Sequence, residues 1–268
     1  MQHVSIYGMY WLSQDEASFA DADGKGDKLL ELRGKTAIIR GAGKGIGQEI
    51  AKSLARAGIH VGLMARSASN LEALCAELQL NDGTKICFAT ASASHYEEVE
   101  RATNELKKEL GPIDYLITVI NPGLGKSRSL AESAPDEWRR NIEVNVLGMY
   151  HMNRAVIQDM IERQSGMIIN VFTKSEASGE ANESANTAAK FALIGMTESL
   201  CREVSDHHIH VIALAPDTID REAAHAMGVA LTGEEWLSQA EEVAELTFAI
   251  IKHPEAGIVK KGFICISD

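Results

Sequence analysis

Short apolar runs alternate with longer amphipathic segments along this chain from residue 34 onward. The runs have the length and flanking residues of buried strands, and the segments between them are long enough for helices. We predict strands at residues 35–40, 60–65, 85–90, 113–121, 166–173, 210–215 and 262–266. We expect helices from the glycine turn after the first strand to about residue 57, and at residues 67–80, 97–110, 135–164 and 184–205. This alternation predicts a doubly wound α/β fold with a parallel sheet of about seven strands.

Residues 1–33 do not follow this alternation. The stretch DADGKGD at residues 21–27 is polar and contains glycine, as a linker does. The apolar stretch from Val4 to Leu12 has no basic flank and is followed by acidic residues, so no signal peptide is predicted. We therefore predict an N-terminal arm or oligomer contact at residues 1–33, and one domain at residues 34–268.

The charge and the cysteines narrow the classes of partner. The formal net charge of −12 disfavours nucleic acid and anionic membranes, and no apolar run approaches the roughly 18 residues that span a bilayer. The cysteines form no C-x-x-C pair and no zinc spacing, so no metal site is predicted. We expect reduced thiols and a cytoplasmic protein. The cysteines are Cys75, Cys87, Cys201 and Cys265.

A glycine-rich turn follows the first predicted strand. It has glycine at Gly41, Gly43, Gly45 and Gly47, with Lys44 and Ile46 between them, and a predicted helix follows. Glycines in this context let the backbone approach a pyrophosphate closely, and the start of the helix presents N–H groups to the phosphates. The turn therefore predicts a dinucleotide site, with a purely structural glycine turn as the alternative.

The end of the second predicted strand bears on which dinucleotide is bound. NAD sites usually place a carboxylate there for the ribose 2′-hydroxyl, but this chain has Ala65 followed by Arg66. A guanidinium suits a 2′-phosphate, and Lys44 would add a second positive charge. We predict NADP(H), with solvated surface charges as the alternative.

Several segments together resemble the short-chain dehydrogenase/reductases, particularly the 3-oxoacyl-acyl-carrier-protein reductases. The resemblance extends from Leu32 to about Glu242. It implies a small-molecule carbonyl or acyl substrate and a homodimer or homotetramer paired through the helices at 135–164 and 184–205. The segments are LRGKTAIIRGAGKGIG, GPIDYLITVINPG, NIEVNVLGMY, SGMIINVFT, AAKFALIGMTESL and HVIALAPDT.

The resemblance also implies a set of catalytic positions. Asn145 and Lys190 match the family asparagine and lysine, and Thr173 stands at the serine position. Asn186 stands where the family has its catalytic tyrosine, four residues before Lys190. A carboxamide has no titratable proton near neutral pH and cannot act as a general acid. His151 is a candidate replacement acid, with an ordinary partly buried histidine as the alternative.

The resemblance places further departures around the cofactor, several of them at its reacting end. Arg40 replaces the threonine before the first glycine, Ser92 replaces the aspartate that contacts adenine, and Arg221 replaces a threonine expected to hold the carboxamide. The N-N-A-G run is replaced by VINPG, and the usual Pro-Gly after the sixth strand is Pro216-Asp217. By the same resemblance the cofactor contacts would include Asn121, Pro216, Thr218 and Lys190.

Three functions remain open from the sequence. The first is an NADPH-dependent carbonyl reductase that works without the tyrosine, since positioning of cofactor and substrate supplies much of the rate. The second is a non-catalytic relative that binds NADP(H) or a partner subunit. The third is a non-redox enzyme for elimination, isomerisation or cyclisation, in which Asn186 and Thr173 stabilise an oxyanion.

Overall fold

The computed structural model describes residues 30–79, 83–120, 128–172, 181–215, 236–254 and 263–265. Six residues singled out from the sequence lie outside the described residues, as does the predicted arm up to residue 29. They are Asn121, Thr173, Pro216, Asp217, Thr218 and Arg221.

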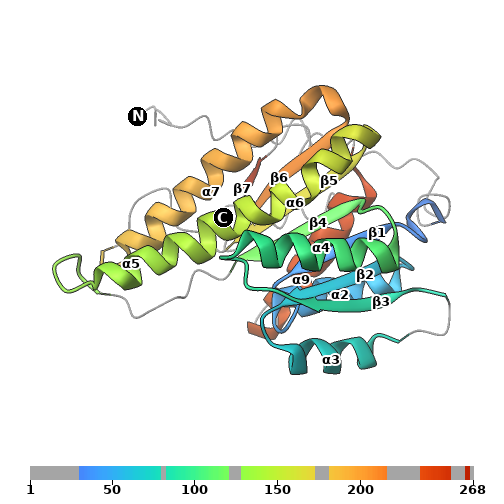
Figure 1. Cartoon of the computed structure of the whole chain (residues 1–268), viewed down its shortest axis with the longest axis horizontal. Coiled ribbons are helices and arrows are strands. Elements are labelled where there is room, and N and C mark those ends of the chain that lie inside the picture. Colours follow the sequence, from blue (N-terminus) through green and yellow to red (C-terminus); the bar gives the residue numbers. More distant parts are fainter. Residues whose placement is uncertain are drawn as a thin grey trace.

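A seven-stranded parallel sheet forms the centre of the molecule (Figure 1). Its strand order is β3-β2-β1-β4-β5-β6-β7, so the chain builds the sheet outward on one side of β1 and then on the other. This confirms the predicted doubly wound α/β fold. Ligands in such folds bind outside the carboxyl ends of the strands where the order reverses, which here is between β1 and β4. The strands are β1 (Thr36–Arg40), β2 (His60–Ala65), β3 (Ile86–Thr90), β4 (Tyr115–Ile120), β5 (Gly166–Phe172), β6 (Ile209–Ala215) and β7 (Phe263–Cys265).

Helices cover both faces of the sheet (Figure 1). One apolar cluster joins the sheet to α2 (Ile46–Arg56), α3 (Ala68–Glu77) and α9 (Trp236–Lys252). Two other clusters join the opposite face to α4 (Tyr96–Leu110), α6 (Gly148–Arg163) and α7 (Ser184–Glu203). Leu32, just before the predicted domain boundary, is buried in the first cluster. No helix among the described residues is long and apolar enough to cross a membrane.

The helical segment predicted over residues 135–164 is present, but it is not a uniform α-helix. α5 (Pro135–Ile142) leads into a π-helical segment, η2 (Glu143–Leu147), before α6 begins. A π segment holds an extra residue per turn, which widens the helix and redirects its side chains, and it often marks a functional site. α9 is a helix that the sequence analysis did not predict.

A polar layer divides the core beneath α6 and α7. We give this name to Thr118 of β4, Asn170 of β5, Asn153 of α6 and Thr197 of α7, all of which are buried. Thr118 and Asn170 are register partners, and Asn170 Nδ2 donates to Thr197 Oγ1 at 3.3 Å. Neither end of the Asn153 carboxamide has a hydrogen-bond partner among the described residues. Apolar clusters lie on both sides of this layer.

Candidate dinucleotide and reaction site

The glycine turn packs too closely on its own backbone to carry side chains at two positions. A Cβ built on Gly47 would lie 2.3 Å from the Gly41 carbonyl oxygen, which is far inside van der Waals contact. Gly41 itself has φ +87°, and a Cβ there would lie 2.8 Å from the Val119 carbonyl oxygen of β4. The turn therefore lies flat across the carboxyl ends of β1 and β4, at the point where the strand order reverses.

α2 begins at this turn with an uncapped amino end. Gly45 is its N-cap, and no side chain there makes a capping hydrogen bond. The first N–H groups of a helix have no partner within the helix, so they remain available to an anion. The space that a Gly45 side chain would occupy is open, with no atom within 4 Å. This is the geometry that a bound pyrophosphate needs.

Positive charge gathers beside the turn. Lys44 in the turn and Arg66 directly after β2 are both exposed. The turn approaches the end of β2, since a Cβ on Gly43 would lie 3.6 Å from the Ala65 Cβ. Burial, and then the charge of Arg66, lower the pKa of Arg40 to about 10. The fold thus places Lys44, Arg66 and Arg40 around the carboxyl ends of β1 and β2.

Asn145 lies in η2 and is fully enclosed, at 1% exposed. Its Nδ2 donates a hydrogen bond of 2.7 Å to Asn141 Oδ1 on α5. Its Oδ1 is buried and accepts no hydrogen bond from any described residue. One end of this carboxamide is therefore fixed within its own helix, and the other end is a free acceptor.

Asn186 and Lys190 lie one helical turn apart on α7, which packs against η2. Residues four apart on a helix share a face, so the two side chains are neighbours. Lys190 is buried at 7% exposed, and the Asn186 Oδ1 is buried without a partner among the described residues. The structure thus brings together the elements that carry Asn145, Asn186 and Lys190. Thr173, the fourth predicted member, directly follows the last residue of β5 and lies outside the described residues.

This arrangement can hold a polar ligand but offers little acid–base chemistry. Two carboxamides supply N–H donors and carbonyl acceptors, and neither titrates near neutral pH. Lys190 is the one titratable group among the three. α7 contains no tyrosine, so this helix supplies no phenol that could act as a proton donor in place of Asn186.

His151 lies on the side of α6 that faces α4. Its Nδ1 is 2.7 Å from the Ala93 carbonyl oxygen, and its ring is 5.7 Å from that of Tyr96 on α4. The Tyr150 ring lies 5.5 Å from the His151 ring. These contacts direct the imidazole away from α7, so they do not favour His151 as a replacement for the missing acid.

Ser92 is held in the loop after β3 by α4. Its backbone N–H donates to Glu98 Oε2 at 2.8 Å, and its Oγ lies 2.8 Å from Ser94 Oγ. The hydrogen bond from Ser92 is the main cause that lowers the pKa of Glu98. At the position where the resemblance implies an adenine contact, the chain thus offers a hydroxyl.

A comparison with known families decides what kind of chain this is. The family described as short chain dehydrogenase matches residues 35–229, which include the glycine turn, Asn145, Asn186 and Lys190. The chain belongs to the short-chain dehydrogenase family.

Short-chain dehydrogenases of several kinds are similar to this chain over most of its length. A 3-oxoacyl-acyl-carrier-protein reductase of Pseudomonas aeruginosa is 35% identical over 224 residues, which are 81% of this chain and 90% of that relative. A 5-keto-D-gluconate 5-reductase of Escherichia coli is 29% identical over 199 residues, or 74% of this chain and 77% of that protein. These relatives are reductases of different carbonyl compounds, so the likeness alone does not choose a substrate.

Solved short-chain dehydrogenase structures share the fold. A metagenomic short-chain oxidoreductase in complex with NADP superposes with a TM-score of 0.73 at 25% identity and covers 88% of this chain and 97% of its own. A variant of actinorhodin polyketide ketoreductase with NADPH gives a TM-score of 0.72 at 25% identity, covering 85% and 94%. Both neighbours are complexes with a phosphorylated nicotinamide dinucleotide.

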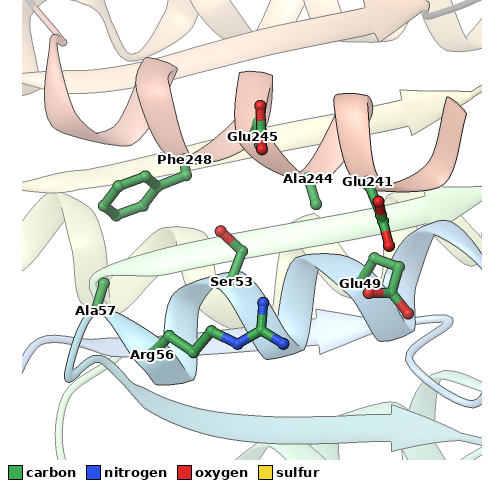
Figure 2. Close-up of a pocket in the computed structure, with 8 residues that line it drawn as sticks. All are labelled: Glu49, Ser53, Arg56, Ala57, Glu241, Ala244, Glu245 and Phe248. Atoms are coloured by element: carbon green, nitrogen blue, oxygen red, sulfur yellow. The ribbon is translucent and has the colours of Figure 1, made fainter. Parts of the chain in front are cut away.

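A hollow between α2 and α9 lies away from the candidate site (Figure 2). Its lining includes Glu49 and Arg56 of α2 and Glu241, Glu245 and Phe248 of α9. Three carboxylates would repel phosphates, and the two helices lie on the opposite face of the sheet from η2 and α7. We therefore do not assign the dinucleotide to this hollow.

Proposed function

We propose that the protein binds NADP(H) across the glycine turn, with its 2′-phosphate on Arg66. The carrying observation is the pairing of an uncapped α2 amino end with a guanidinium, and no carboxylate, directly after β2. Helix amino ends and guanidinium groups are the two devices that proteins commonly use to hold phosphates. The NADP and NADPH complexes of the solved neighbours support the same cofactor.

We propose that the reaction is the interconversion of a ketone and an alcohol, with 3-oxoacyl-like compounds as the substrate class. The name of the Pseudomonas relative supports this class. When bound, the cofactor would supply or accept hydride. The Asn186 carboxamide would donate a hydrogen bond to the substrate oxygen, and Lys190 would hold the cofactor ribose. Because Asn186 carries no titratable proton, the proton must come from another source, and we expect a rate about 10² to 10⁴-fold below that of a site with an acid.

The binding step is tested with Arg66→Ala. We expect this variant to weaken NADPH binding about tenfold, measured by nucleotide fluorescence, and to change NADH binding less than about threefold, because only NADPH carries the 2′-phosphate. Arg202→Ala, which removes an exposed arginine from the far end of α7, is the matched control and should change neither. Equal effects on both nucleotides would overturn the assignment of Arg66.

A binding-only relative is the second candidate, and the buried free oxygens of Asn145 and Asn186 favour it. Such a site can hold a hydrogen-bond donor without moving a proton. Tight NADPH binding with no turnover on a panel of ketones would support this candidate. Turnover above that of a combined Asn186→Ala and Lys190→Ala variant would support the reductase.

We also propose a homo-oligomer paired through η2, α6 and α7. Large apolar side chains are exposed there, with Leu147 at 41%, Tyr150 at 48% and Phe191 at 37%. Exposed apolar groups that gather on adjoining elements commonly mark an interface. Light scattering should show a dimer or tetramer that Tyr150→Lys weakens, whereas a monomer at all concentrations would contradict the proposal.

A further inference from the structure

The Arg40 side chain bridges two parts of the chain that are far apart in sequence. Arg40 ends β1 and directly precedes the glycine turn. Its Nη1 donates to the Val119 carbonyl oxygen on β4 at 2.9 Å, and its Nη2 donates to the Val144 carbonyl oxygen in η2 at 3.4 Å. One planar guanidinium thus fastens the end of β4 to the π segment, at the residue directly before Asn145.

The acceptors of Arg40 are main-chain carbonyls. Among the described residues no carboxylate acts on the pKa of Arg40, and the charge of Arg66 repels its guanidinium. A pKa near 10 still leaves the guanidinium charged at neutral pH. A partly buried guanidinium is destabilised if it loses its hydrogen bonds. The Val119 and Val144 carbonyl oxygens are therefore held within hydrogen-bond distance of Arg40.

The glycine turn contacts the same bridge. The Gly41 Cα approaches the Val119 carbonyl so closely that a Cβ there would lie 2.8 Å from its oxygen. On the η2 side, a Cβ on Gly148 would lie 3.6 Å from the Arg40 Nη2, within ordinary contact. The turn, the end of β4 and η2 therefore meet around one side chain.

We propose that Arg40 is a positioning residue that couples the glycine turn to η2, so that a dinucleotide on the turn holds the Asn145 carboxamide in place. This coupling rests on the proposed cofactor, whereas the bridge itself does not. Two departures from the family pattern lie at this one contact, namely Arg40 for threonine and the altered sequence at the end of β4. The side chain of Arg40 supplies the donors of this contact, whereas its acceptors are main-chain carbonyls that any residue at positions 119 and 144 would offer.

The test compares Arg40→Met and Arg40→Lys with the matched control Arg101→Met by hydrogen–deuterium exchange. Arg101 also donates to a strand-end carbonyl, that of Thr90 at 3.1 Å, but it is exposed and lies on α4. Without ligand, we expect Arg40→Met to accelerate exchange about tenfold in peptides covering residues 143–148, since bonds to charged groups are lost. We expect Arg101→Met to leave these peptides unchanged.

Arg40→Lys separates charge from bridging. It keeps the positive charge but not the planar fork, so we expect NADPH affinity within about threefold of the wild type and accelerated exchange at 143–148. In the wild type, saturating NADPH should slow exchange at 143–148 about threefold, and in Arg40→Met that slowing should disappear although NADPH still binds.

Two results would overturn the inference. The first is unchanged exchange at residues 143–148 in Arg40→Met. The second is acceleration spread equally over α2, α4 and η2, because that would indicate general destabilisation. Slowing by NADPH that persists in Arg40→Met would overturn the coupling. If the wild type binds no NADPH, the proposed cofactor fails, and the bridge is still decided by the ligand-free comparison. Should Arg40→Met not fold, Arg40→Lys decides by the same ligand-free readout.

Discussion

Asn145 donates a side-chain hydrogen bond to Asn141, one turn earlier in the same helical segment, at 2.7 Å. Both side chains are buried. The consequence is that the orientation of the Asn145 carboxamide depends on a residue of the preceding helix, α5. Asn141 is thus a positioning residue for the proposed reaction site.

Replacing Asn141 by leucine should release the Asn145 carboxamide. We expect a loss of stability of about 1 to 3 kcal/mol, because a buried donor loses its acceptor. Any ketone reduction should fall several-fold in kcat with little change in the KM for NADPH. Asn141→Asp keeps an acceptor oxygen and should restore kcat relative to Asn141→Leu; equal kcat in the two variants would contradict the positioning role.

Asn186→Tyr should add a proton donor to the proposed site. We expect ketone reduction to rise about 10² to 10⁴-fold, in line with the usual contribution of a general acid. The measurement is NADPH oxidation with 3-oxoacyl substrates, and Asn186→Phe is the control that adds a ring without a hydroxyl. No gain over Asn186→Phe would mean that the other departures have already removed the reductase geometry.

Asn153→Leu in the polar layer should stabilise the fold. The carboxamide is buried with no hydrogen bond to the described residues at either end, and leucine has the same branched shape with apolar methyl groups in place of the amide atoms, although it is larger. Removing unpaired polar atoms from an apolar environment should raise the free energy of unfolding by about 1 kcal/mol in urea titrations. The control is Asn170→Leu, which breaks the bond to Thr197 and should destabilise. A loss of stability in Asn153→Leu would show that this prediction is wrong.

Asp159 should give the fold a pH-dependent contribution. Burial acts to raise its pKa, but hydrogen bonds and charges from Lys107 and Arg163 outweigh it, and the net pKa is lowered from 3.8. A lowered folded-state pKa means that the contribution is present above about pH 4 and is lost as the pH falls through the folded-state pKa. Asp159→Asn should therefore cost up to about 1 kcal/mol at pH 7, and the difference should close in acid. A difference that stays constant from pH 7 to pH 3 would contradict this.

The described thiols should react slowly with alkylating reagents. Burial raises the pKa of Cys75 and Cys201, and burial followed by the proximity of Cys75 raises the pKa of Cys87 to about 11. Since the thiolate is the reacting form, Cys87 should be the slowest of the three with iodoacetamide at pH 8, followed by mass spectrometry. Alkylation of Cys87 as fast as that of an unfolded control would disprove the shift.

Most strands and helices could be predicted from the sequence, because continuous apolar runs mark buried strands and glycines mark the turn. β2 has the predicted bounds at His60–Ala65, and the glycine turn lies between a buried strand and a helix as expected. The π segment was not predicted because α5 has only 8 residues, which offer too few apolar positions to reveal the shift of phase that an extra residue causes. The role of Arg40 escaped because its partners are main-chain carbonyls, which every residue has.

For the candidate site, the sequence predicted which residues share an element but not how every side chain is oriented. Asn186 and Lys190 could be placed on one helix face from their spacing alone, and α7 bears this out. The direction of His151 could not, because it depends on how α6 rotates against α4. α9 was missed although it completes one face of the sheet, and with it the acidic hollow shown in Figure 2.

The π segment sets a length constraint on this part of the chain. η2 runs from Glu143 to Leu147, with α5 before it and α6 after it. Deleting one residue there would let the backbone close into a uniform α-helix, and α5 would then turn by about 100° relative to α6. Asn141 would leave the interior, and Arg139 or Arg140 would be driven toward it. Variants with insertions or deletions should therefore be tolerated before Pro135 or after Gln164 far more readily than between them.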